Sequence, residues 1–384
     1  MNLSDEYEPE TYGTLGTDTF RVFFKRKLPN ASDPDSAQIY ISPFHDIPIY
    51  SELAPNIHRM IVRMPRWSSE RMEICKTEPF NPIRQDSSRQ LLRYYDNIFP
   101  YHGVLWNCGS FPQTWEMLSY MHPDFKDLKG DNGLLDVLEI GSRIHKTGTV
   151  LDVKILGAIV LIDQDHLDWK IFAIDINDPL ASKIDNIVGI EEHMPGLLDS
   201  TLDFFRFYKT SMGHLPITFG YGKIFLDKQI ALDTIVGSHA AWKKLIKNEV
   251  PIKQSKDTAD FKLFNTQCLE SNREYLRNSK EAEALIENLK MLVTNRPIES
   301  MAQPPSIQQI ERVIYLNKRL ILNNLSKAEE QEKLKKEIEI KKEQTYFDNL
   351  GKFLQDNFYT LVLPASLLSV ALYFSTKKSI FVKV

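Results

Sequence analysis

The stretch Lys129-Gly130-Asp131-Asn132-Gly133-Leu134-Leu135-Asp136-Val137-Leu138-Glu139-Ile140-Gly141 places an acidic loop directly before an apolar strand. Asp131 and Asp136 are short carboxylates, and hard cations such as Mg²⁺ prefer oxygen ligands of this kind. A loop that surrounds a metal with carboxylates is expected to carry an acid at its middle, where this chain has Gly133. The stretch therefore has the frame of a magnesium loop without its central acid.

The amino-acid composition narrows the possible classes of protein. The chain has 384 residues, of which 42% are hydrophobic and 26% charged, as expected for one large globular domain with appendages. The net charge of −4 offers no basic surface for nucleic acid. The 3 cysteines are far apart and have no metal-ligand spacing, which favours a reducing compartment and argues against a disulfide framework.

The two ends of the chain differ. The acidic N-terminus has neither the apolar run of a signal peptide nor the basic amphipathicity of a transit peptide. Residues 357–376 carry no formal charge and precede Lys377 and Lys378. An uncharged run of 20 residues is long enough to cross a hydrocarbon core of about 30 Å, so we expect a transmembrane helix here. A buried core helix is the alternative.

Alternating apolar residues predict strands before the helices begin. The ranges are 20–27, 59–64, 71–75, 90–95, 147–162 and 168–175. Strands of this length with few helices between them favour a closed barrel over a βαβ sheet. Helical spacing follows at 195–209, 227–247 and 279–294.

A Pro-containing linker then leads into a long helical pattern. Residues 327–343 alternate Lys and Glu three or four apart, which is typical of a solvated helix. We interpret the pattern as an exposed stalk, with a coiled coil as the alternative. The expected organisation is a tail (1–17), a main domain (18–248), an irregular and helical linker (249–305), the stalk (306–350), the membrane helix (357–376) and a short tail (377–384).

Ionisable residues placed for chemistry occur along the main domain: Glu73, Arg93, Asp131, Asp136, Asp163, Asp168, Lys170, Tyr208 and Lys209. Taken alone, Asp163 and Asp168 would read as turn residues. Their order within the whole set favours a functional role.

That order resembles the family I soluble inorganic pyrophosphatases of the fungal and animal type, over residues 18–248. The matching stretches are FHDIPIY (44–50), PRW (65–67), FPQTWE (111–116), DVLEIG (136–141), DWK (168–170), AIDINDPLA (173–181), MPGLL (194–198) and FRFYK (205–209). The resemblance implies a mainly β fold with helices, an OB-like five-stranded barrel. It also implies Mg²⁺-dependent hydrolysis of diphosphate to two phosphates.

The resemblance assigns roles residue by residue. Metal-binding positions are Asp131, Asp136, Asp163 and Asp168, with Glu73 near the metals. Phosphate-binding positions are Arg71, Arg93, Lys170, Tyr208 and Lys209. Arg66, Trp67 and His102 match positions near the family's dimer contact, so a homodimer is expected there.

The chain also departs from the family pattern. Gly133 stands where the family has the acid that helps to generate the nucleophile, and Arg63 replaces a ligand Glu. Val104 and Cys108 replace two active-site tyrosines. Five carboxylates now face five cations, counting Arg63 and Arg71, so the site can neutralise itself without metal. We therefore expect Mg²⁺ binding to be weak or lost.

These departures favour a catalytically inactive pyrophosphatase-like protein that serves as a membrane-anchored accessory subunit of a membrane complex. The expected location is the mitochondrial inner membrane, and the alternative is a tail anchor in the outer mitochondrial or endoplasmic reticulum membrane. The alternative function is an active Mg²⁺-dependent inorganic pyrophosphatase. A third hypothesis keeps phosphate binding without chemistry.

Overall fold

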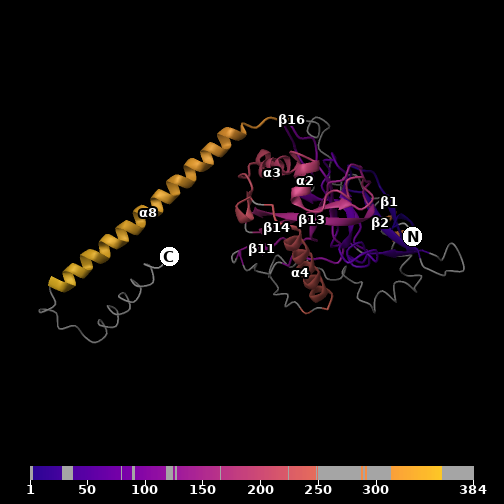
Figure 1. Cartoon of the computed structure of the whole chain (residues 1–384), viewed down its shortest axis with the longest axis horizontal. Helices are drawn as coiled ribbons and strands as arrows, with labels where there is room; N and C mark the ends of the chain where they lie inside the picture. The colour runs from indigo at the N-terminus through magenta and orange to yellow at the C-terminus, as the bar shows by residue number, and fades with distance from the viewer. Residues whose placement is uncertain are drawn as a thin grey trace. The chain divides into compact units, whose positions relative to one another are not determined.

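The computed structural model describes most of the main domain and the helix after it. The described residues are 3–27, 38–247 with gaps at 79, 89–90, 118–123, 126–127, 165 and 224, then 249, 287–288, 290–291 and 313–356. The chain divides into two units, Met1–Leu316 and Asn317–Val384. All strands of the described residues lie in the first unit (Figure 1).

Five strands of the first unit close into a ring. They are β4 (Ile57–Met64), β10 (Asn107–Ser110), β12 (Asp136–Glu139), β13 (Val150–Asp163) and β14 (His166–Asp175). The pairings run β14–β12–β10–β4–β13, and β13 pairs again with β14. The ring confirms the predicted five-stranded barrel. Two short strands extend the sheet, β11 (Lys129–Gly130) on β14 and β15 (Thr218–Phe219) on β13.

A second sheet contains the N-terminus. It consists of β1 (Tyr7–Tyr12), β2 (Arg21–Lys27), β3 (Gln38–Ile41), β5 (Met72–Ile74) and β6 (Ile83–Gln85), with α1 (Leu3–Glu6) before it. The expected tail over 1–17 is therefore wrong for its first half, because β1 pairs with β2 along its whole length. Acidic β1 faces basic β2, as in the 2.9 Å pair between Lys25 and Glu10.

Helices follow the barrel strands. They are α2 (Ile187–His193), α3 (Leu197–Phe207) and α4 (Lys228–Ile246), with the 3-10 turns η2 (Thr210–Met212) and η3 (Gly220–Lys223). The predictions at 195–209 and 227–247 are confirmed, and α2 was not predicted. The side chains of Asn186 and Asp227 cap α2 and α4 by accepting from the N–H groups of Gly189 and Ile230.

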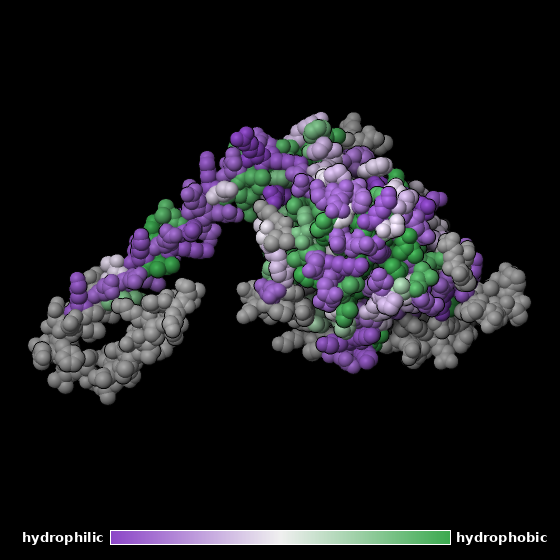
Figure 2. All heavy atoms as spheres, in the orientation of Figure 1, coloured by the Kyte–Doolittle hydropathy of each residue, from purple (hydrophilic) through white to green (hydrophobic). Residues whose placement is uncertain are grey.

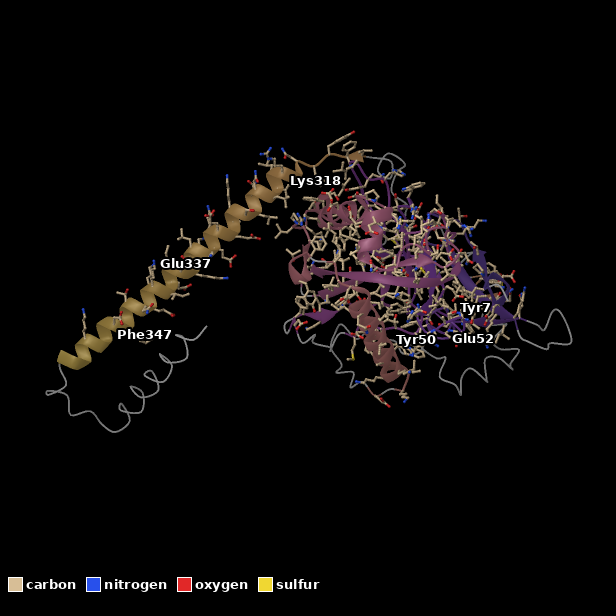
Figure 3. The ribbon with its side chains drawn as sticks, viewed as in Figure 1. Tyr7, Tyr50, Glu52, Lys318, Glu337 and Phe347 are labelled. Atoms are coloured by element: carbon tan, nitrogen blue, oxygen red, sulfur yellow. The ribbon has the colours of Figure 1, made fainter. Side chains whose placement is uncertain are left out.

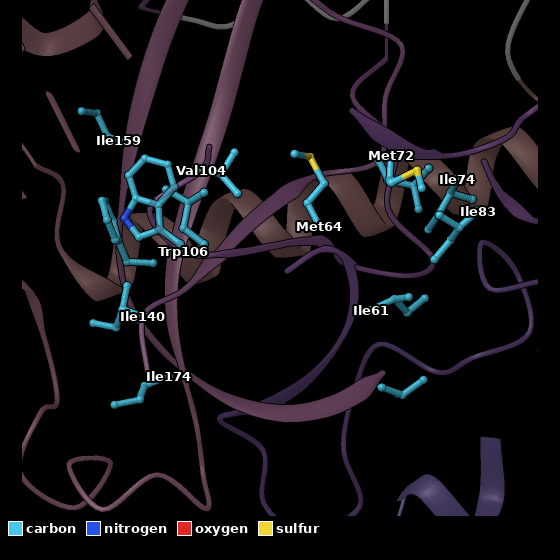
Figure 4. Close-up of a cluster of buried hydrophobic side chains, with 14 of the residues drawn as sticks. Ile61, Met64, Met72, Ile74, Ile83, Val104, Trp106, Ile140, Ile159 and Ile174 are labelled. Atoms are coloured by element: carbon cyan, nitrogen blue, oxygen red, sulfur yellow. The ribbon is translucent and has the colours of Figure 1, made fainter. Parts of the chain in front are cut away.

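Two apolar clusters fix these helices to the barrel. Phe204 and Phe205 of α3 pack in one cluster with β13 and β14, and Ile235 of α4 packs in the other against the opposite face. Figure 1 shows α3 and α4 on opposite sides of β13. Figure 4 shows part of the first cluster, which includes Met64 and Trp106.

Four short strands lie outside the two large sheets. These are β7 (Ser87–Ser88), β8 (Leu91–Leu92), β9 (Asn97–Ile98) and β16 (Val313–Ile314). The strand predicted over 90–95 is thus reduced to β8. The pair β9–β16 is parallel and places residues 313–314 on the first unit, although the sequence assigned them to the stalk. A β-branched and aromatic run explains this, since such residues favour strands.

The second unit is described by the helix α8 (Lys318–Asp356), which begins later and ends later than the stalk expected over 306–350. Figure 2 shows a mainly hydrophilic surface on α8, broken by separate hydrophobic residues. Glu337 and Phe347 both project from it (Figure 3). Within the described residues no helix is long and apolar enough to span a membrane. The predicted span at 357–376 and most of the helix predicted at 279–294 lie outside those residues.

Candidate functional site

A polar cavity of about 220 Å³ opens where the barrel meets the second sheet and the end of α3. Apolar core residues that include Met64, Met72, Val104 and Trp106 form part of its lining (Figure 4). Its ionisable lining is Arg63, Arg71, Glu73, Lys76, Asp131, Asp136, Asp163, Asp168, Lys170 and Lys209. The cavity therefore gathers most of the residues that the sequence selected.

The floor of the cavity is set by strand register. Asp136 and Lys170 are direct neighbours across the parallel pair β12–β14, and Asp168 lies two residues from Lys170 on the same face. The Lys170 Nζ donates to Asp136 Oδ2 at 2.5 Å and to Asp168 Oδ1 at 2.6 Å. One lysine thus bridges two carboxylates, the buried Asp168 and the half-buried Asp136.

Arg63 of β4 occupies the second oxygen of Asp136. Its guanidinium donates to Asp136 Oδ1, and also to the Gly109 carbonyl at 3.3 Å. β10 can approach β4 closely because Gly109 has no side chain: a Cβ there would lie 2.3 Å from the Ile61 carbonyl oxygen. Both oxygens of Asp136 are therefore held by cations that belong to the chain itself.

Electrostatics matches this geometry. Burial raises the pKa of Asp136, but the charges of Arg63 and then Lys170 outweigh it and lower the pKa overall. Burial lowers the pKa of Lys170, and Asp136 and Asp168 more than compensate, so that pKa is raised. Asp168 has a pKa raised to about 6, first by burial. The Arg63–Asp136–Lys170 network is fully charged at neutral pH.

A separate ion pair closes one edge of the cavity. Asp163, the last residue of β13, accepts a hydrogen bond from the Lys209 Nζ, two residues after α3. The same Nζ lies 5.3 Å from the Tyr208 ring centroid. The structure thus brings Asp163, Tyr208 and Lys209 together, with the lysine already paired.

The first acid of the 131–136 loop, Asp131, binds the loop's own backbone. Asp131 Oδ1 accepts from the Gly133 N–H at 2.7 Å, and Asn132 adopts a left-handed φ of 68°. A Cβ at Gly133 would lie 2.8 Å from Asp131 Oδ1, so a residue with a side chain there requires Asp131 to rotate. The missing central acid therefore also changes the orientation of the acid that is kept.

One acid of the site was not selected from the sequence. Glu116 is 6% exposed, its Oε1 accepts from the Trp169 N–H at 3.3 Å, and its Oε2 has no partner among the described residues. Burial, and then Asp131 and Asp168, raise its pKa well above the usual value. The stretch FPQTWE contained the signal, since its terminal acid follows the buried Trp115.

These acids test whether a divalent metal fits. Glu116, Asp131 and Asp168 offer oxygens within 4.8 Å of one another, a donor set suited to one hard cation. Each oxygen of Asp136 already accepts a hydrogen bond from a cation of the chain, and Gly133 offers no side-chain oxygen. The residues fit a single ion and do not fit a cage of several metals.

Another part of the cavity lining is aromatic. The Tyr95 and Tyr208 rings stack with centroids 5.8 Å apart, and the Arg71 guanidinium lies 5.1 Å above the Tyr95 ring. Glu73 lies on the same side, and its pKa is raised first by burial and then by Asp86. Tyr95 is the second residue of the site that the sequence did not select.

Two predicted groups lie elsewhere. Arg93 does not line the cavity and instead pairs with Asp86 at 2.6 Å. Lys76 lines the cavity in place of Arg93. The cavity lining therefore still contains five acidic and five basic side chains. Cys108 lines the cavity with a pKa raised to about 12 by burial, which leaves an unreactive thiol.

The predicted dimer region lies outside this cavity. Trp67 is 57% exposed and adopts a left-handed φ of 67°, and His102 is exposed. Arg66 is directed inward and donates to the Gly141 carbonyl at 2.5 Å. Trp67 and His102 are available for contact, whereas Arg66 is used within the domain.

Comparisons with known proteins find similarity to inorganic pyrophosphatases. The family model described as inorganic pyrophosphatase matches residues 60–243. An inorganic pyrophosphatase of Candida glabrata is 45% identical over 231 residues, which is 60% of this chain and 78% of the relative. One of Drosophila melanogaster is 38% identical over 280 residues, 73% of this chain and 78% of the relative.

Solved structures of pyrophosphatases are also similar to this chain. The inorganic pyrophosphatase of Schistosoma japonicum superposes with a TM-score of 0.60 at 32% identity, covering 80% of this chain and 100% of that one. A truncated vacuolar soluble pyrophosphatase of Trypanosoma cruzi, solved in complex with PPi, gives 0.58 at 32% identity, with 63% and 92% covered.

Proposed function

The chain belongs to the inorganic pyrophosphatase family, and we propose that it is a member that does not turn over diphosphate at an ordinary enzymatic rate and serves as an accessory subunit. The observation that carries this proposal is the Arg63–Asp136–Lys170 network. A guanidinium is always charged, so Arg63 is a permanent cation at the oxygen that a metal would need.

The physical consequence concerns the nucleophile. Divalent cations, when bound, lower the pKa of water from about 15.7 towards about 7. In this chain Arg63 and Lys170 satisfy Asp136 without supplying such a water, and Gly133 provides no base. Loss of a general base alone costs about 10²–10⁴ in rate.

The test is diphosphate hydrolysis by the full chain in mild detergent with millimolar Mg²⁺. We expect a rate at least about 10²-fold below an ordinary turnover of about 10 s⁻¹. Turnover near that value would overturn the proposal.

A double variant sharpens this test. Arg63→Glu with Gly133→Asp releases Oδ1 of Asp136 and supplies two more acids, so we expect Mg²⁺ binding by calorimetry before any gain in rate. The matched control is Arg93→Glu with Gly133→Asp, which makes the same charge change with its arginine outside the cavity. Equal Mg²⁺ binding by both variants would show that Arg63 does not block the site.

The second candidate function is active Mg²⁺-dependent hydrolysis of diphosphate to two phosphates. The cluster of Glu116, Asp131 and Asp168 favours it, and so do the names of the relatives. Under this hypothesis the wild-type chain hydrolyses diphosphate, and Glu116→Gln abolishes the activity together with Mg²⁺ binding. Activity that survives Glu116→Gln would exclude this cluster as its source.

We further propose that residues 357–376 anchor the chain in a membrane and that its partners are subunits of a membrane complex. The uncharged run before Lys377 and Lys378 supports an anchor. The mitochondrial inner membrane is the proposed location, with the outer mitochondrial or endoplasmic reticulum membrane as alternatives. Membrane fractionation of the chain with and without 357–384, and its co-purifying proteins in mild detergent, test these points.

A homodimer through Trp67 and His102 is a separate proposal. An exposed tryptophan is a common anchor of protein interfaces, which supports it. Trp67→Ala should then yield a monomer by light scattering. An unchanged mass would contradict a contact at this surface.

A further inference from the structure

We propose that Glu10, Tyr12 and Tyr40 form a binding site for an alkylammonium group on the second sheet. The ligand that this ammonium site holds is Lys290, from the linker expected over 249–305. None of these four residues lines the polar cavity. The ammonium site is therefore separate from the cavity and does not depend on whether the chain hydrolyses diphosphate.

Strand register places the residues of the ammonium site on one face of the sheet. Glu10 and Tyr12 are two residues apart on β1, and Glu10 lies directly opposite Phe23 of β2. Tyr40 of β3 lies directly opposite Lys25, which is two residues after Phe23. Side chains two apart on a strand share a face, so these five line one surface across three strands.

A buried aromatic base supports the two tyrosines. The Tyr12 and Phe23 ring centroids are 6.0 Å apart at 70°, and those of Phe23 and Tyr40 are 6.3 Å apart at 82°. Such edge-to-face contacts are a preferred geometry of aromatic pairs. Phe23 is buried together with Phe80 in one small apolar cluster, against which both tyrosines pack. Packing within the sheet therefore fixes the positions of the two tyrosine rings.

Glu10 supplies a negative charge beside these rings. Its carboxylate accepts hydrogen bonds from the Tyr40 hydroxyl and, at 2.9 Å, from the Lys25 Nζ. Burial raises the pKa of Glu10, but the hydrogen bonds from Tyr40 and Lys25 outweigh it, so the pKa is lowered overall. Glu10 is therefore ionised at neutral pH, and its field favours a cation on this face.

Lys290 of the linker reaches this surface. Its Nζ lies 4.7 Å from the Tyr12 ring centroid and 5.2 Å from the Tyr40 ring centroid. Both distances are within the range of about 6 Å for a cation–π contact. The same Nζ donates to Glu287 Oε1 at 2.5 Å, and the Lys290 side chain is only 13% exposed. A head group that is normally hydrated thus lies between two aromatic rings.

The chemistry of the ammonium site selects a cation. Burial lowers the pKa of Lys290, but hydrogen bonds with Glu287 and Tyr12 outweigh it and raise the pKa, so the head group stays charged. Aromatic faces around one nitrogen are the arrangement that recognises ammonium and methylated ammonium groups. Acetylation of Lys290 removes the charge, so it should release this part of the linker from the sheet.

The first test is hydrogen–deuterium exchange of the full chain in mild detergent, measured on peptides that contain 287–291. We expect exchange there to be about tenfold faster in Lys290→Met than in the wild type, because the side chain keeps its length and loses its charge. Lys290→Arg keeps the charge and should retain most of the protection. Lys336→Met on α8 is the matched control and should leave exchange at 287–291 unchanged.

The second test asks whether the emptied ammonium site binds a soluble cation. Lys290→Ala vacates the space between the rings, so saturation-transfer NMR should detect saturable binding of tetramethylammonium to this variant, and much weaker binding to the wild type. Adding Tyr12→Leu to Lys290→Ala should abolish that binding. Unchanged exchange protection of β2 in both variants would show that the sheet remains folded.

Two results would overturn the inference. Equal exchange at 287–291 in the wild type and in Lys290→Met would mean that the charge does not hold the linker. Tetramethylammonium binding that is absent from Lys290→Ala, or equal in Lys290→Ala and the wild type, would mean that the contact is apolar packing and that the tyrosines do not recognise an ammonium group.

Discussion

The cavity and helix α8 use the same kinds of charged residues in opposite surroundings. In the cavity, Lys170 is bonded to two carboxylates, and its side chain is 10% exposed. On α8, Lys336 lies 3.0 Å from Glu332, and the two side chains are 70% and 68% exposed. The distances within the ion pairs are similar, but the exposure of the side chains to solvent differs.

The difference teaches what each set of charges can do. Water screens the α8 pairs, so they keep a long helix soluble and add little to its stability. The paired side chains of Arg63, Lys170 and Asp168 in the cavity are largely buried, so each of these charges depends on its partner, and the partners fix one arrangement. The cavity pairs therefore hold their side chains in fixed positions, whereas the α8 pairs stay in contact with solvent.

The largest expected effect comes from breaking the buried network. Lys170→Met leaves Asp168 without the cation that neutralises it and removes one of the two held by Asp136, and we expect a loss of about 3–5 kcal/mol in the free energy of unfolding. Urea denaturation measures it. Lys336→Met is the matched control and should leave the transition unchanged. A loss below about 1 kcal/mol for Lys170→Met would show that water reaches the cavity pairs.

The next effect comes from a buried group that forms no ion pair among the described residues. His58 on β4 is 2% exposed, and burial lowers its pKa from 6.5 to about 4. The folded state disfavours the charged ring, so stability is complete above pH 6.5 and falls as the pH drops towards about 4. At about 1.4 kcal/mol per pH unit this contribution is about 3 kcal/mol.

The measurement is the free energy of unfolding between pH 7 and 4. His58→Phe removes the titrating ring, so its profile should be flatter than the wild-type profile over this range. Parallel profiles for the two chains would assign the acid sensitivity to other groups.

A smaller effect measures how strongly two cavity charges are coupled. A double-mutant cycle with Arg63→Met and Asp136→Asn should give a coupling energy of about 1–3 kcal/mol, because both groups are largely buried and in contact. A value near zero would mean that Asp136 depends on Lys170 alone, and the guanidinium would then be a weaker obstacle to a metal.

The smallest effect is expected on α8. A cycle with Lys336→Ala and Glu332→Ala should give no resolvable coupling at physiological salt, because both side chains are exposed and screened. Helix content by circular dichroism is the measurement. A coupling as large as that of Arg63 with Asp136 would indicate that α8 is covered by a partner.

The sequence alone determined the features that depend on local pattern. Long apolar strands at 147–162 and 168–175 predicted the barrel, and the 3.6-residue spacing after residue 195 located α3 and α4. The order of acids from Asp131 to Asp168 carried the resemblance to the pyrophosphatase family, and comparison with that family's pattern revealed the departures at Gly133 and Arg63.

Tertiary structure decided what depends on neighbours distant in sequence. It paired acidic β1 with basic β2, placed Lys76 rather than Arg93 in the cavity, and added Glu116 and Tyr95 to the site. It also engaged both oxygens of Asp136. Burial and pairing set the behaviour of an ionisable group, and both arise only when strands and loops far apart in the chain close around it.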